Sequence, residues 1–293
     1  MADGTLYIVG TPIGNLRDIS LRALEVLQCA DVIAAEDTRV TRKLLHAHGI
    51  VNDSLVSLHE HNESSRSETL MQRMRGGEDV ALVSDAGTPL ISDPGFILVR
   101  SWAEAGGRIE IIPGPSAAIS ALCASGLPPE PGTFVGCAPK KAPRIRRWIQ
   151  ERMRPPGTFI AFVPARNATE LVEILAEEQP DARIVLSREI TKEHETHHRS
   201  RAADFTLAEE HVRGEATLVV HFGVDPADPA EQRRQILRDL PPLRDRGLSD
   251  RDAISAIAIL REIPRRVVAD IVRDADDLPT CSPSRARAST RFP

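Results

Sequence analysis

The first 125 residues alternate short apolar runs with segments of helical periodicity, and this alternation limits the possible fold more than any other feature. The apolar runs, each bounded by Gly, Pro or Asp, cover residues 5–9, 31–35, 80–84 and 109–112. The helical segments between them cover residues 21–28, 38–48, 64–75 and 96–105. Buried strands joined by helices predict βαβ units and a mostly parallel sheet, which binds ligands at the carboxyl ends of its strands.

A second lobe is predicted after the segment GLPPEP at residues 126–131, because three closely spaced prolines interrupt both helix and strand. Strand-like runs follow at 158–163, 183–187 and 216–222, with a helical segment at 169–178. The polar segment DPADPAEQ from residue 225 predicts a linker, and two helices are expected at 248–260 and 264–272. We therefore expect an α/β lobe of residues 1–125, a second of 126–224, a helical appendage of 225–280 and a disordered tail of 281–293.

The composition is that of an ordinary globular protein, with 41% apolar and 27% charged residues in 293. No run approaches the roughly 18 apolar residues of a membrane helix, and the beginning of the sequence does not resemble a secretion signal. Four scattered cysteines exclude a zinc ribbon or a disulfide framework, so the cytoplasm is expected. The net charge of −5 gives no overall attraction to nucleic acid, but residues 139–154 contain seven Lys or Arg and one Glu. Such a run is either a solvated helix face or a phosphate-binding patch.

Three polar turns follow predicted strands at the edge where a parallel sheet binds ligands. The first, GTPIGNLRD, has Gly10 and Gly14 for close backbone approach but neither a GxGxxG pattern nor a Walker lysine. The second, SDAGTP, presents Asp85, which can accept hydrogen bonds from a ribose or an amine. In the third, PGPSAA, the backbone amides of residues 116–118 open a helix and can hold a carboxylate. Three such turns together indicate a ligand site.

Other polar clusters allow two interpretations each. Glu36, Asp37 and Arg39 follow the predicted strand 31–35 and form either an acid–base group or a helix cap with its counter-ion. The run HEHNE at 59–63 has the composition of a metal site but lacks a third spaced ligand. The run HETHH at 194–198 is not HExxH, so we expect no metal site.

Six segments, in order between Leu6 and Phe222, carry a resemblance to a known family. They are LYIVGTPIGNLRDIS, ADVIAAEDTRVTRKLL, HEHNE, VALVSDAGTPLISDPG, IIPGPSAAISAL and REITKEHET. Together they resemble the ribosomal small-subunit RNA methyltransferase I family, a branch of the tetrapyrrole-methylase superfamily. The resemblance implies two α/β lobes with the cofactor cleft between them, a C-terminal helical appendage and a cytoplasmic homodimer. It also implies methyl transfer from S-adenosyl-L-methionine to a cytidine ribose 2′-hydroxyl in the decoding region of 16S rRNA.

The resemblance and the predicted strand ends together assign site residues. We expect the cofactor to contact Thr11, Pro12, Gly14, Asp85, Ala86, Gly87, Ser116, Ala117 and Ala118 from the first lobe, and Phe162 and Thr217 from the second. The expected acceptor-side residues are Asn15, Glu36, Asp37, Arg39, Lys140 and Glu189. As a hypothesis, Glu36 or Asp37 is the base and Arg39 orients the RNA. The expected phosphate contacts are Lys140, Lys141, Arg144, Arg146 and Arg147.

Two alternatives to an RNA methyltransferase remain open. The same fold also hosts methylases of tetrapyrroles and other small molecules, so the fold alone does not decide the substrate. A non-catalytic RNA-binding or assembly factor is the other alternative. It is suggested by residues 162–167, FVPARN, where the family usually has a Phe-Tyr-Glu-Ser-like run followed by His-Arg.

Overall fold

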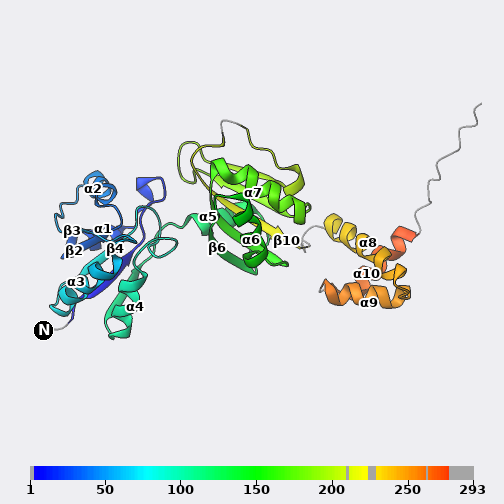
Figure 1. The fold of residues 1–293 in the computed structure, drawn as a ribbon, viewed down its shortest axis with the longest axis horizontal. Helices are drawn as coiled ribbons and strands as arrows, with labels where there is room; N and C mark the ends of the chain where they lie inside the picture. The colour runs from blue at the N-terminus through cyan, green and yellow to red at the C-terminus, as the bar shows by residue number, and fades with distance from the viewer. Residues whose placement is uncertain (1–2, 209–210, 224–228, 262, 277–293) are drawn as a thin grey trace, which may run out of the picture. The chain divides into compact units, whose positions relative to one another are not determined.

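The computed structural model describes residues 3–208, 211–223, 229–261 and 263–276. The chain divides into two compact units, residues 1–223 and 224–293 (Figure 1). The first unit contains two five-stranded sheets, and the described part of the second contains helices. The tail 281–293, expected to be disordered, lies outside the described residues.

The first sheet is entirely parallel, with the strand order β3-β2-β4-β1-β5. Its strands are β1 (Thr5–Val9), β2 (Val32–Ala35), β3 (Leu55–Ser57), β4 (Val80–Val83) and β5 (Arg108–Ile112). Alternate residues face opposite sides: Leu82 packs with α3 and α4, whereas Ala81 packs with α1 and α2. The helices are α1 (Leu21–Cys29), α2 (Thr38–Ala47), α3 (Glu63–Arg75) and α4 (Phe96–Glu104), with a short η1 (Leu16–Asp18) before α1. Burial on both faces explains why the central strands are continuous apolar runs.

The second sheet is mixed, with the order β6-β7-β10-β8-β9, in which only the β6–β7 pair is parallel. Its strands are β6 (Gly132–Cys137), β7 (Gly157–Pro164), β8 (Arg183–Arg188), β9 (Thr196–Arg201) and β10 (Glu215–Phe222). One face is covered by α6 (Ala142–Arg152) and α7 (Ala165–Glu178), with η2 (Ala202–Asp204) beside α7.

The other face of the second sheet is covered by α5 (Ala117–Ser125). Ala118 and Ala121 of this helix pack against Val185 and Val219 in one buried cluster. The helix thus precedes the expected lobe boundary at residue 126 in sequence but packs on the second sheet. It connects the end of β5 to the second sheet, and the residues that start it lie at the carboxyl edge of the first.

The described part of the second unit is three helices around a small core of their own. They are α8 (Pro229–Asp245), α9 (Asp250–Leu260) and α10 (Arg265–Asp276), and the core includes Ile236, Leu240, Ile257 and Val268. The two expected helices are confirmed. The expected linker was wrong for residues 229–232, because the second proline of DPADP starts α8. No helix among the described residues is long and apolar enough to cross a membrane.

Candidate functional site

A cleft of about 530 Å³ lies within the first unit and is lined by residues from the ends of both sheets. Its volume is in the range of small-molecule sites. The second and third predicted turns contribute to its wall directly. The predicted site residues that line it are Glu36, Asp85, Ala86, Gly87, Ser116, Ala117, Lys140, Phe162, Glu189 and Thr217.

The first predicted turn supports the wall of the cleft and contributes Ile13 to its lining. Thr11 is buried, and its N–H donates to the Gly87 carbonyl at 2.8 Å, while the Gly87 N–H donates back at 3.1 Å. Pro12 is buried beside it, and Asn15 caps η1 by accepting from the Arg17 N–H. Of the predicted cofactor contacts, Thr11, Pro12, Gly14 and Ala118 therefore lie behind or beside the cleft lining.

Two glycines of the first turn permit close approaches that a side chain would prevent. A Cβ atom on Gly10 would lie 2.7 Å from the backbone N and Cα of Gly114, so the turns after β1 and β5 touch through their backbones. A Cβ atom on Gly14 would lie 2.5 Å from Cγ of Lys192 and 3.0 Å from the Ile190 carbonyl oxygen. The first turn thus packs against the loop after β8, bringing elements of the two lobes together beside the cleft.

Carboxylates at the ends of β2 and β4 link the two strand ends. The Glu36 carboxylate accepts the Asp85 N–H at 3.2 Å, and the Asp85 carboxylate accepts the Asp37 N–H at 3.0 Å. Burial raises the pKa of Glu36 and of Asp85, and their mutual repulsion adds to this for Glu36. The wall at this end of the cleft is therefore rich in carboxylates.

Asp37 and Arg39 do not line the cleft; they form an ion pair in which Asp37 is half-buried and Arg39 is exposed. The Arg39 guanidinium donates to both oxygens of the Asp37 carboxylate, with NH2 at 2.6 Å from Oδ2, and Asp37 also caps α2. These bonds from Arg39 lower the pKa of Asp37 to about 2. Of the two interpretations of this cluster, the geometry of Asp37 matches the helix cap with its counter-ion.

Asp93, which sequence analysis did not assign, lines the cleft near Glu36 and Asp85. Burial, followed by repulsion from the Glu36 carboxylate, raises its pKa to about 6. It follows β4 within the segment SDAGTPLISDPG, so the position after a parallel strand was the available signal.

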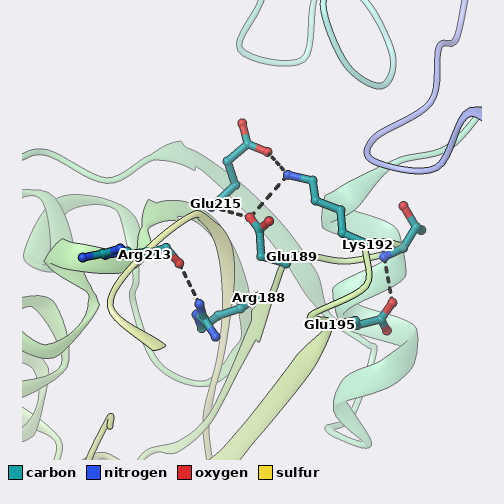
Figure 2. Close-up of polar contacts among 7 residues, drawn as sticks. Arg188, Glu189, Lys192, Glu195, Arg213 and Glu215 are labelled. Atoms are coloured by element: carbon teal, nitrogen blue, oxygen red, sulfur yellow. Dashed lines mark hydrogen bonds and ion pairs between the residues drawn. The ribbon is translucent and has the colours of Figure 1, made fainter. Parts of the chain in front are cut away.

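The second sheet contributes a charged cluster to the cleft lining, which Figure 2 shows in detail. The Lys192 ammonium lies between Glu189 and Glu215, 3.3 Å and 3.0 Å from their carboxylate oxygens. The Glu189 carboxylate also accepts the Glu215 N–H at 2.9 Å. Burial opposes charge on Glu189, yet the Glu215 N–H and the Lys192 ammonium leave its pKa lowered. Glu189 and Thr191 adopt left-handed backbone conformations, with φ of 49° and 67°, so this loop is held in a strained form.

Ion pairs with glutamates neutralise some of the cations of the basic segment 139–154. Arg146 of α6 pairs with Glu177 and Glu178 of α7, and Arg147 pairs with Glu151 one turn further along α6. Lys140 lines the cleft, and within the described part of the chain Lys140, Lys141 and Arg144 have no ion pair. Of these cations, Lys140 is the one that lies in the cleft wall.

The two histidine-rich runs have structural partners. In HEHNE, the Asn62 side chain bonds the backbone of residues 57 and 59, and the Glu63 carboxylate accepts the Gly95 and Ile97 N–H groups at the start of α4. In HETHH, His197 bonds Ser187 and Glu195. Among the residues that the structure describes, no three His, Cys, Asp or Glu side chains gather as metal ligands.

The fold is similar to that of solved methyltransferases. Residues 5–206 match the family described as Tetrapyrrole (Corrin/Porphyrin) Methylases. Uroporphyrin-III-C-methyltransferase from Thermus thermophilus superposes with a TM-score of 0.54 at 23% identity, covering 74% of this chain and 94% of that one. Diphthine synthase superposes with a TM-score of 0.56 at 17% identity, covering 75% and 91%. The family match makes the chain a member of the tetrapyrrole-methylase class, and the similar structures confirm the predicted fold class.

Relatives of higher sequence identity identify the family within the tetrapyrrole-methylase class. Ribosomal RNA small subunit methyltransferase I of Escherichia coli O157:H7 is 43% identical over 242 residues, which cover 80% of this chain and 84% of that protein. The protein of the same name from Bacillus subtilis strain 168 is 36% identical over 273 residues, covering 91% and 93%. The chain belongs to the ribosomal RNA small subunit methyltransferase I family. The resemblance found in the sequence is thereby confirmed.

Proposed function

We propose that this chain transfers a methyl group from S-adenosylmethionine to the ribose 2′-hydroxyl of a cytidine in the 16S rRNA of the small ribosomal subunit. Family membership supplies the reaction class and the RNA substrate. The observation that carries the proposal is the cleft, because strand-end turns, a helix start and an acidic wall converge there from both sheets. The cytoplasm as compartment and a homodimer as working form belong to the same proposal.

The residues of the cleft fit S-adenosylmethionine. Carboxylates of Glu36 and Asp85 whose pKa values are raised suit a cationic ligand, because a positive charge beside them relieves their repulsion. Ser116 and Ala117 at the start of α5 offer N–H groups for the carboxylate of an amino acid. Phe162, held edge-on by Phe134 at 4.9 Å between ring centroids, offers an apolar surface for a base.

When bound, S-adenosylmethionine supplies a methyl group on a positively charged sulfur, so no metal or covalent intermediate is needed. The protein's part is to align donor and acceptor, which is worth several kcal/mol. The backbone contact between the turns after β1 and β5 and the packing of Gly14 on the Ile190–Lys192 loop fix the walls that perform this alignment. The acceptor hydroxyl must also lose its proton, which requires a base in the cleft.

The RNA approaches, in this proposal, along the basic segment that leads to the cleft. Lys140 lies in the cleft wall, and Lys141 and Arg144 follow it at the start of α6. Their ammonium and guanidinium groups neutralise phosphates and make binding sensitive to salt. Only 3% of the residues are aromatic, which favours recognition of RNA backbone and shape over extensive base stacking.

The test uses small ribosomal subunits from cells that lack this protein. The purified chain and S-adenosylmethionine should introduce one ribose methyl group, located by mass mapping of the rRNA. A porphyrin precursor in a parallel reaction should remain unmethylated; methylation of the porphyrin but not of the subunit would identify a small-molecule methylase. Absence of S-adenosylmethionine binding by calorimetry would instead identify a non-catalytic RNA-binding factor.

A further inference from the structure

The loop between β4 and α4 is strained next to the cleft. Leu90 and Ser92 have φ angles of 74° and 72°, in the left-handed region that residues with a Cβ rarely adopt. Strained backbone of this kind persists only where the surrounding structure fixes it, and it concentrates at functional sites. Asp93 follows directly and lines the cleft.

The end of this loop is fixed from two sides. Gly95 has a φ of 120°, and a Cβ atom there would lie 2.7 Å from Cδ2 of Leu82, so the loop packs directly on β4. The Glu63 carboxylate accepts the Gly95 N–H at 2.9 Å and the Ile97 N–H at 2.8 Å. These contacts hold the backbone on the far side of Asp93 and explain how a strained loop presents its carboxylate at a constant position.

The carboxylates of this wall and the neighbouring Asp37 differ in the hydrogen bonds that they already accept. Glu36 and Asp85 each accept a backbone N–H, and Asp37 is held by Arg39. In the described part of the chain no backbone N–H donates to the Asp93 carboxylate; the polar side chain that faces it is the Ser84 hydroxyl. Asp93 is thus the carboxylate of this wall that is most available to a substrate.

We propose that the Asp93 carboxylate is the general base that removes the proton from the acceptor ribose hydroxyl. This inference rests on the proposed function. Asp93 accepts the proton while the hydroxyl oxygen keeps the O–H electron pair and bonds to the methyl carbon. The sulfur keeps the electron pair of the S–CH3 bond that breaks, so S-adenosylhomocysteine leaves uncharged at sulfur. Asp93 then releases the proton to water.

The electrostatic surroundings support this role. Burial and the Glu36 carboxylate raise the pKa of Asp93 to about 6, with a smaller effect from Asp85. A base with a pKa near the working pH combines a large ionised fraction with good proton affinity. The other charged groups of the cleft are Lys140, Glu189, Lys192 and Glu215, of which Lys192 is paired with both glutamates. Lys140 remains as the unpaired cation among the described cleft residues.

The decisive experiment measures single-turnover methylation of small ribosomal subunits between pH 5 and 9, at saturating S-adenosylmethionine. The wild-type rate constant should rise with pH through a midpoint near the pKa of Asp93. D93N should lower it about 100-fold or more and abolish this rise. D93E should retain part of the rate constant and part of its rise with pH, because glutamate also carries a carboxylate. D53N, a substitution in the loop before β3 and outside the cleft, should leave the rate unchanged.

Two further measurements on D93N do not depend on catalytic turnover. Calorimetry should give D93N an affinity for S-adenosylmethionine within about threefold of wild type, because the proposed role is toward the acceptor. Carbon-13 NMR of the free protein should show one aspartate titrating near pH 6, and this signal should be missing in D93N.

The outcomes separate this inference from the proposed function. If the wild type methylates subunits but D93N retains its rate and pH dependence, Asp93 is not the base. If E36Q instead removes the pH dependence, Glu36 has that role. If the wild type transfers no methyl group to the subunit, the proposed function itself fails.

Discussion

At the residue scale, the groups that surround each carboxylate determine its pKa and therefore the chemistry it can perform. Glu36, Asp37, Asp85 and Asp93 all lie near the ends of β2 and β4, and composition alone does not distinguish them. Asp37 receives bonds from Arg39 and its own helix, so its pKa falls to about 2 and a weak base results. Asp93 is half-buried near like charges, so its pKa rises to about 6. Neighbouring aspartates therefore differ by several pKa units because of their partners.

The raised pKa of Asp93 predicts a cost in stability. Unfolded, this carboxyl ionises at its ordinary value of 3.8, whereas in the folded protein it ionises at about 6. Between these values the unfolded chain binds fewer protons, so stability falls as pH rises from about 4 to 6 and stays lower at neutral pH. D93N removes this penalty and should raise the melting temperature at pH 7.5 by roughly 2–4 °C, or about 1 kcal/mol after allowing for solvent screening.

Thermal melting of the wild type and D93N at several pH values tests this. The gain should shrink toward pH 4, because the folded-state carboxyl is then protonated and the unfolded-state carboxyl is only partly ionised. A gain that is the same at pH 4.5 and 7.5 would show that ionisation of Asp93 is not its cause. D53N, which alters an exposed aspartate, is the control for the charge change alone.

At the element scale, the sequence was most informative where strands are buried on both faces. Runs such as TLYIV, which became β1, are apolar throughout because helices cover both sides of the first sheet. The turns after β1, β4 and β5 were therefore predictable, and residues of all three line or support the cleft. In contrast, β3 has three half-buried residues and β9 reads THHRSR, so neither gives an apolar run.

The residues of the site that directly follow buried strands were predictable from the sequence, whereas those in longer loops were not. Residues directly after buried strands, such as Asp85 and Ser116, could be located by counting from the strand. Asp93 and Lys192 could not, because each lies in a loop whose path depends on left-handed backbone positions at residues with side chains, such as Leu90 and Thr191. Sequence patterns favour glycine at such positions, so they do not predict the path of these turns. For Asp93, its place in the segment after β4 was the one signal available.

The contact between the turns after β1 and β5 predicts a strong effect of G10A. The added Cβ atom would meet the backbone of Gly114 at 2.7 Å, and backbone atoms cannot move aside as a flexible side chain can. We expect a loss of about 1–3 kcal/mol in the free energy of unfolding, measured by denaturant titration, and weaker S-adenosylmethionine binding. G76A, at the end of α3, should cost less, since its Cβ atom would lie 3.1 Å from the Arg73 carbonyl oxygen. Equal losses would contradict the contact.

The ion pairs of α6 predict which of its cations bind RNA. The double variant K140A/R144A removes two cations without ion pairs among the described residues, so it should weaken RNA binding and reduce the slope of log K against log salt by about 2. R146A/R147A removes two cations that already have Glu177, Glu178 and Glu151 as partners, and it should change the slope less. S-adenosylmethionine affinity should be unchanged in R146A/R147A. Equal slopes for the two variants would contradict this assignment.

At the scale of the whole molecule, the chain consists of two units with separate cores. Every residue that lines the cleft lies between Ile13 and Thr217, within the first unit. The described helices of the second unit bury Ile236, Ile257 and Val268 against one another. No buried cluster among the described residues combines side chains from both units. This separation predicts that cofactor binding and the second unit's contribution can be measured independently.

A chain that ends at Gly223 should therefore fold and bind S-adenosylmethionine with an affinity within about threefold of the full chain, measured by calorimetry. The reason is that all cleft-lining residues and all strands of both sheets remain, so the wall positions do not change. If methylation of small ribosomal subunits falls while this affinity and the melting temperature of the first unit are retained, the second unit acts on the RNA substrate. If the shortened chain unfolds or binds the cofactor more than about tenfold more weakly, the cleft depends on residues 224–293, and the two units are not independent.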